Sequence, residues 1–123
     1  MSMATAVNDE TPTPAGPYSL AIVAAGFIFV SGQRPVEPAS ELIPDGISEQ
    51  TLQIGKNLTA VLATTGARLC DVVKVTAHLA DMQLFDEFNE VYSQIFEPPY
   101  PARTTVGSHL RGVLVEMDVI AYV

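Results

Sequence analysis

The chain has 123 residues, of which 48% are hydrophobic, and this length fits one domain with its own core but is too short for two. Only 16% of the residues are charged, against roughly 25% in a typical soluble domain, so we expect part of the surface to be buried between subunits. The formal net charge of -8 and the six Lys and Arg residues leave no basic patch, which disfavours nucleic acid as a partner.

The cysteine content and the first residues bear on the compartment. Cys70 is the only cysteine, so an internal disulfide is impossible and nothing indicates an oxidising compartment. Residues 1–14 lack the positive start and apolar run of a secretory signal, and no apolar stretch approaches the roughly 20 residues that span a bilayer. We therefore expect a cytoplasmic protein without a membrane partner.

The first third of the chain is predicted to contain a tail, a hairpin and a loop. Residues 1–14 are small, polar and interrupted by proline, which predicts a flexible N-terminal tail ahead of a single domain over residues 15–123. Short apolar runs at residues 18–24 and 27–31 surround Ala25-Gly26 and predict a β-hairpin. Residues 35–46 contain three prolines and are predicted to form a loop.

The rest of the chain alternates between helical and strand patterns. Ser48 is expected to cap a helix that Gly66 ends, with apolar residues recurring close to every 3.6 positions. Residues 71–80 alternate as a half-buried strand does, with one face formed by Val73, Val75, Ala77 and Leu79 and the other by Lys74, Thr76 and His78. A second amphipathic helix covers residues 84–96 and ends at Glu97-Pro98-Pro99.

Two final strands, at residues 103–108 and 113–122, complete the order β-β-α-β-α-β-β. This order predicts an α+β fold in which two helices lie on one face of a mixed sheet. The opposite face of the sheet then needs a cover. Because charged residues are scarce, we expect other copies of the same chain to supply it.

Arginine is the most informative candidate for chemistry. The sequence has no Gly-rich phosphate loop and no nucleophile elbow, and His78 and His109 are too isolated to indicate a metal cluster. Arg103 stands at the head of an apolar strand and requires an anionic partner, because a buried unpaired guanidinium is costly. Either Glu116 or Asp118 neutralises it, or it binds the carboxylate of a substrate in two parallel hydrogen bonds.

Six short motifs in the same order resemble the Rid family, also called YjgF/YER057c/UK114. They are Gly16-Pro17-Tyr18-Ser19, Phe29-Val30-Ser31-Gly32-Gln33, Asp71-Val72-Val73-Lys74, Phe88-Asn89-Glu90-Val91-Tyr92, Pro101-Ala102-Arg103 and Val115-Glu116-Met117-Asp118. Each motif alone is weak, but six in order from Gly16 to the end of the chain are specific.

The resemblance implies a chorismate-mutase-like fold, a homotrimer and active sites in clefts between subunits. It also implies that Arg103 holds the carboxylate of 2-enamine or 2-imino acids and that Glu116 helps to position water. Tyr18, Ser31, Gly32 and Asn89 fall on family positions near the ligand. The reaction that the resemblance implies is hydrolytic deamination to a 2-keto acid and ammonia, and we expect it to need no metal or other cofactor.

Several positions depart from the family pattern and leave the substrate open. Leu20 replaces a common glutamine, Thr104 and Thr105 follow the arginine where other members carry serine, alanine or cysteine, and the connection at residues 107–112 is short. One alternative is a deaminase for a larger substrate, of the 2-aminomuconate type or biosynthetic. Another is a trimer that binds a small carboxylic acid without turnover.

Overall fold

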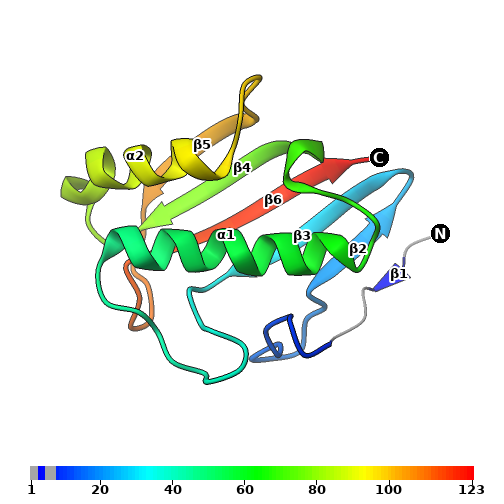
Figure 1. Cartoon of the computed structure of the whole chain (residues 1–123), viewed down its shortest axis with the longest axis horizontal. Coiled ribbons are helices and arrows are strands. Elements are labelled where there is room, and N and C mark those ends of the chain that lie inside the picture. Colours follow the sequence, from blue (N-terminus) through cyan, green and yellow to red (C-terminus); the bar gives the residue numbers. More distant parts are fainter. Residues whose placement is uncertain (1–2, 5–7) are drawn as a thin grey trace.

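The computed structural model describes residues 3–4 and 8–123, which form a six-stranded sheet with two helices on one face (Figure 1). The strands are β1 (Met3–Ala4), β2 (Ala21–Ala24), β3 (Phe27–Gln33), β4 (Val72–Leu79), β5 (Ala102–Gly107) and β6 (Val115–Tyr122). The helices are α1 (Ile47–Ala63) and α2 (Phe85–Ile95), and short 3-10 helices at Leu69–Asp71 and Met82–Leu84 precede β4 and α2.

The sheet has the order β1-β2-β3-β6-β4-β5. β4 and β5 run parallel, and the other neighbouring strands are antiparallel. The predicted α+β class, with a mixed sheet and both helices on one face, is therefore confirmed, and β1 is an additional edge strand. The β2–β3 hairpin turns at Ala25 and Gly26, whose φ angles of 53° and 84° are those of the two-residue turn that suits the twist of a hairpin.

The core lies between the helices and the sheet. Alternate residues of β6 are buried, as the period of two in a strand requires when one face is covered. α1 contributes Ile54, Leu58, Val61 and Leu62 to this core, and α2 contributes Phe88 and Tyr92. The helices approach closely at Gly55, where an added Cβ would lie 3.1 Å from the Ile95 side chain.

Two local predictions were wrong. Ser48 is not the helix cap: α1 begins at Ile47 with Gly46 at the N-cap, and the Ser48 hydroxyl donates a hydrogen bond to Glu87 of α2 instead. Val73 does not share the buried face of β4, because the pairing of β4 with β6 shifts between Val72 and Lys74 and this irregularity turns Val73 outward. The alternation of β4 holds from Val75 onward.

The predicted tail includes residues 1–2 and 5–7, which lie outside the described part of the chain. Within that tail, Met3–Ala4 pairs with β2, and the Asn8 side chain accepts from the Glu10 and Thr11 amides. The boundary of the domain at residue 15 stays a prediction.

The sheet face opposite the helices carries an exposed aromatic group. The ring of Phe27 lies 4.9 Å from that of Tyr122 and 6.3 Å from that of Phe29, and all three side chains are at least 40% exposed. An apolar patch of this kind is typical of a surface that meets another protein. Among the described residues, no helix combines the length and apolar character needed to cross a membrane.

Candidate functional site

Arg103 lies on the edge strand β5, in register with Val75 of β4. Val75 is fully buried beneath the helices, so Arg103 also projects toward the helix side of the sheet. Its guanidinium carbon lies 4.6 Å from the ring centroid of Tyr92 and 5.6 Å from those of Phe85 and Phe88. These rings of α2 form an aromatic floor that orients the guanidinium by cation–π attraction.

No carboxylate of the chain neutralises Arg103 in the described residues, where the ion pair found is that between His78 and Asp118. The hypothesis of a structural pair with Glu116 or Asp118 is therefore not supported. The register explains this result. Val75 pairs with both Arg103 and Val119, so Glu116 lies two strands away and three residues along, about 10 Å in each direction.

The two residues also point to opposite faces of the sheet. Glu116 lies between the buried residues Val115 and Met117, so its side chain projects from the open face while Arg103 projects toward α2. Asp118 shares the open face with Glu116 because the two are separated by two positions. One copy of the chain therefore cannot bring Arg103 and Glu116 to the same small ligand.

Three polar atoms near Arg103 are buried without a hydrogen-bond partner among the described residues: Asn89 Oδ1, Tyr92 OH and Thr105 Oγ1. Asn89 and Tyr92 lie on the α2 face that carries Phe85 and Phe88, because the four occupy positions i, i+3, i+4 and i+7. Thr105 lies two positions after Arg103 on β5. A buried polar atom left unpaired costs about 1–3 kcal/mol, so this region is prepared for a polar ligand or partner.

Burial raises the pKa of the Tyr92 hydroxyl above its usual value of 10.0, and the charge of Arg103 partly opposes this rise. Desolvation dominates because the neutral phenol tolerates an apolar environment better than the phenolate does. Tyr92 is therefore a neutral hydrogen-bond donor near neutral pH.

The other predicted site residues gather around Gly32. A Cβ added to Gly32 would lie 3.3 Å from Oε1 of Glu116, and Gly32 lies where the pairing of β3 with β6 shifts, between Val30 and Gln33. The Ser31 hydroxyl donates to the Ser19 carbonyl at 2.6 Å. Tyr18 and Gly32 line one cavity of about 140 Å³.

The predicted residues thus divide into two groups. The first, called here the arginine group, consists of Arg103 and Asn89 on the helix side of the sheet. The second, called the glutamate group, consists of Tyr18, Ser31, Gly32 and Glu116 at the β3–β6 end. Sequence reasoning missed the aromatic floor, since Phe85, Phe88 and Tyr92 have the spacing of ordinary core residues.

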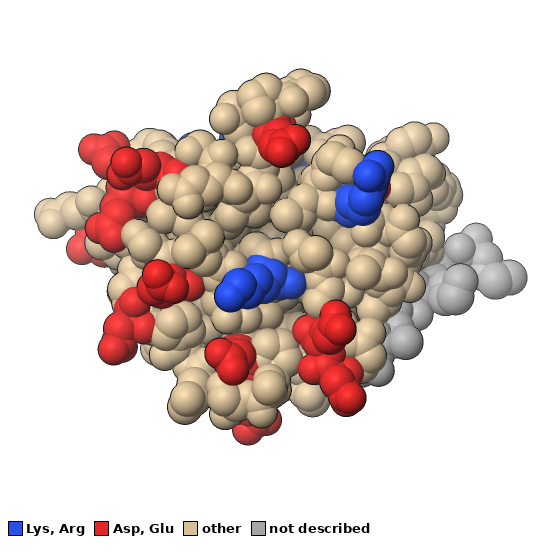
Figure 2. Space-filling model, viewed as in Figure 1, with Lys and Arg blue, Asp and Glu red and all other residues tan. Residues whose placement is uncertain are grey.

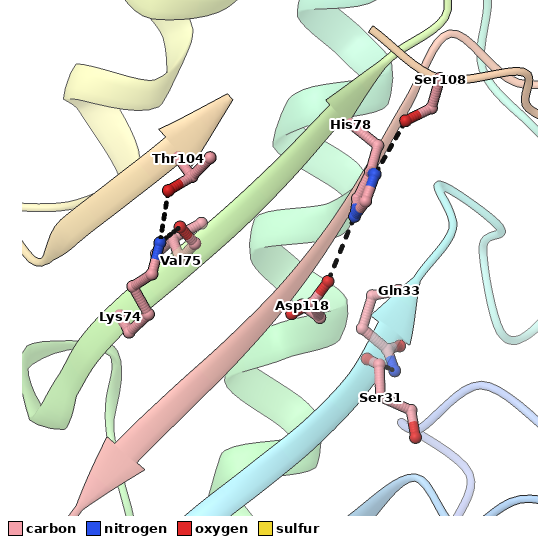
Figure 3. A network of polar contacts seen from close by, with 8 residues as sticks. All are labelled: Ser31, Gln33, Lys74, Val75, His78, Thr104, Ser108 and Asp118. Carbon is pink, nitrogen blue, oxygen red and sulfur yellow. Dashed lines mark hydrogen bonds and ion pairs between the residues drawn. The ribbon is translucent and has the colours of Figure 1, made fainter. Parts of the chain in front are cut away.

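Sequence reasoning also missed a polar chain on the open face. His78 Nδ1 lies 2.9 Å from Ser108 Oγ, and His78 Nε2 lies 3.4 Å from Asp118 Oδ2, so the three side chains form one line (Figure 3). Next to it, Lys74 Nζ donates to Thr104 Oγ1 at 2.8 Å. The tautomer of His78 follows from its partners, because Asp118 accepts a hydrogen bond and Ser108 can accept or donate one.

Comparison with known proteins agrees with this fold. Residues 8–123 match the protein family described as Endoribonuclease L-PSP, and the chain belongs to this family, the YjgF/Rid family. A RutC family protein of Pyrococcus abyssi is 47% identical over 118 residues, covering 94% of this chain and 93% of its own. A crystal structure of a Rid family protein of unknown function from Yersinia pestis has a TM-score of 0.94 at 33% identity, with 100% of both chains covered.

A bovine relative is named 2-iminobutanoate/2-iminopropanoate deaminase. It is 37% identical over 115 residues, which cover 91% of this chain and 84% of the relative. The family description mentions a ribonuclease, but Asp and Glu outnumber Lys and Arg on the face that carries the helices (Figure 2). With a net charge of -8, such a surface repels phosphate backbones.

Proposed function

We propose that the chain hydrolyses 2-imino acids and their 2-enamine tautomers to 2-keto acids and ammonia, with Arg103 binding the substrate carboxylate. The observation that carries this proposal is the partly buried guanidinium, which has no acidic partner in the described part of the chain. A planar fork of donors fixed on an aromatic floor matches a planar carboxylate in two parallel hydrogen bonds. The name of the bovine relative supports the same substrate class.

The site is completed by a second copy of the chain. Arg103 and Glu116 project from opposite faces of one sheet, so a cleft between copies is the arrangement that unites the arginine group with the glutamate group. In a cyclic trimer, each copy contributes its arginine group to one cleft and its glutamate group to the next. The exposed aromatic residues Phe27, Phe29 and Tyr122 give the open sheet face an apolar area to bury in such an assembly.

The chemistry needs orientation and one base. With the substrate carboxylate held by Arg103, the imine carbon faces Glu116. Glu116 takes a proton from a water molecule while the oxygen of that water attacks the imine carbon. The proton then passes to nitrogen and gives a carbinolamine. Glu116 next takes the hydroxyl proton of this intermediate and delivers it to the amino group, so that the C–N bond breaks, ammonia leaves and the carbonyl of the keto acid forms. Orientation lowers the activation barrier by several kcal/mol, and by about 7–11 kcal/mol in well-oriented intramolecular reactions. General base catalysis typically accelerates a reaction by a further factor of about 10²–10⁴.

A coupled assay tests the proposal. An amino-acid oxidase generates 2-imino acids from alanine, 2-aminobutyrate and larger amino acids, and a dehydratase generates the enamines from serine and threonine. We expect the protein to accelerate keto acid and ammonia formation, with or without a chelator, because the imine carbon is activated by its own substituents. If the protein accelerates none of these reactions but still binds 2-keto acids, it is instead a ligand-binding trimer. If it prefers the largest substrates, it is the specialised deaminase.

A further inference from the structure

Two carboxylates of β6 face the open side of the sheet, and their surroundings differ. Glu116 and Asp118 are two residues apart, which separates them by about 7 Å along a strand. Asp118 Oδ2 lies 3.4 Å from His78 Nε2. Glu116 has no hydrogen bond or ion pair in the described residues and lies over Gly32. The Asp118 carboxylate is therefore engaged by His78, whereas the Glu116 carboxylate has no partner among the described residues.

His78 is placed to cause this difference. In the antiparallel register of β4 and β6, His78 stands directly opposite Glu116, where Cβ atoms are typically about 5 Å apart. The ring nevertheless bonds to Asp118 on one side and to Ser108 on the other (Figure 3). The imidazole thus lies beside Glu116 while its nitrogens are engaged elsewhere.

The two hydrogen bonds of His78 persist in both of its protonation states. The neutral ring donates from Nε2 to Asp118 and accepts at Nδ1 from the Ser108 hydroxyl, whereas the charged ring donates to both, because a hydroxyl can reverse its role. The ring can therefore take up a proton without losing either hydrogen bond.

The other elements around His78 add few charges. β5 presents the uncharged Val106 opposite it, and the two β3 residues drawn beyond Asp118, Ser31 and Gln33, are also uncharged (Figure 3). Lys74 lies four positions earlier on β4, where Thr104 and the Val75 carbonyl hold its ammonium group. His109 follows Ser108 but is exposed in the loop. Asp118 and Glu116 are thus the acidic groups that face the ring.

We propose that His78 is a positioning residue that engages Asp118 and thereby leaves Glu116 as the single unengaged carboxylate facing the substrate. This inference rests on the proposed function for the role of Glu116 as the base. Without His78, the Asp118 carboxylate would lose this hydrogen-bond donor, and its negative charge would act on Glu116 from about 7 Å. Repulsion between two carboxylates favours the protonated form of one of them, and protonated Glu116 cannot accept a proton from water.

Replacing His78 and Asp118 together separates this role from a structural one. We expect His78→Gln to move the acid limb of the kcat/KM pH profile toward neutral pH by about one unit, from two charges at this distance in a partly solvated site. The double variant with Asp118→Asn should move it back, because the unopposed charge is removed. An unshifted limb in the single variant, or a double variant at least as impaired as the single one, would overturn the proposal.

Carbon-13 NMR of the carboxyl groups gives a readout that does not need turnover. The Glu116 signal, assigned through Glu116→Gln, should titrate at higher pH in His78→Gln than in the wild type and return in the double variant. His109→Gln is the matched control and should leave the signal unchanged. His78→Asn replaces His78→Gln if the latter does not assemble. A wild type without imine hydrolysis defeats the proposed function alone, whereas unchanged titration of Glu116 in the His78 variants defeats this inference alone.

Discussion

Replacing Arg103 tests the proposed carboxylate binding separately from packing, because the side chain also packs on the aromatic rings of α2. Arg103→Ala removes the paired hydrogen bonds to the substrate, which are worth about 2–4 kcal/mol when a charged group is lost from a desolvated cleft. At 1.36 kcal/mol per tenfold change, kcat/KM falls by roughly 30- to 1,000-fold. Arg103→Lys keeps the charge but not the planar fork, so most of the activity should be lost in this variant too.

The same replacement also removes contacts with the aromatic floor. The guanidinium carbon lies within 5.6 Å of three ring centroids, and cation–π attraction at a partly exposed site contributes about 0.5–1 kcal/mol. A loss of this size lowers the melting temperature by only a few degrees, since about 1 kcal/mol corresponds to roughly 4 °C in a domain of this length. The variants should therefore fold and keep the oligomeric state of the wild type.

The assay measures turnover, melting temperature and oligomer size on the same preparations. Arg68→Ala is the matched control, because Arg68 is an exposed arginine outside both groups of site residues and should retain wild-type kcat/KM. A stable, fully active Arg103→Ala protein would refute carboxylate binding by Arg103. Activity that falls only in proportion to the folded fraction would show that the residue is structural.

Three further replacements test the surroundings of the site. Tyr92→Phe should preserve or raise stability near neutral pH by up to about 1 kcal/mol, because its buried hydroxyl has no partner in the described residues; chemical denaturation measures this, and a large loss would show a hidden hydrogen bond. Because burial raises the pKa of Tyr92 in the folded state, ionisation of this phenol is harder in the folded than in the unfolded chain. The free energy of unfolding is therefore unaffected by Tyr92 ionisation below about pH 10 and falls as the pH rises through the folded-state pKa. Denaturation of the wild type should thus be more alkali-sensitive than that of Tyr92→Phe. Gly32→Ala should lower kcat/KM but not the melting temperature, because the new methyl group meets the Glu116 carboxylate at 3.3 Å, and wild-type kinetics would disprove this crowding. Gly55→Ala should cost about 1–3 kcal/mol of unfolding free energy because its Cβ meets Ile95 at 3.1 Å; an unchanged denaturation midpoint would show that the helices separate freely.

Much of the fold could be predicted from local patterns. The turn at Ala25-Gly26 needs positive φ angles, and the sequence indicates it. The buried face of β4 follows from alternation, except at Val73, because a shift of register depends on the partner strand and leaves no local signal. Gly46 rather than Ser48 is the N-cap of α1. The sequence could not show this, because a serine near the start of a helix can either cap the helix or, as Ser48 does, contact a distant helix.

The site was harder to predict because its geometry depends on long-range pairing. The motif match singled out Arg103 and Glu116 as candidates, but only the register places them on opposite faces of the sheet. His78 lies 30 positions before Ser108 and 40 positions before Asp118 in the chain, although it contacts both. Spacing along a chain cannot reveal such a contact without the order of the strands.

Mixing two impaired variants tests most directly the claim that one copy supplies Arg103 and another supplies Glu116. Arg103→Ala and Glu116→Gln proteins are unfolded together in equal amounts, refolded and assayed for 2-imino acid hydrolysis. Random assembly unites an intact arginine group with an intact glutamate group in about a quarter of the clefts, so the mixture should recover about a quarter of wild-type activity while each variant alone keeps only its low residual activity. If mixed oligomers form but activity does not exceed that of the separate variants, the shared site is contradicted.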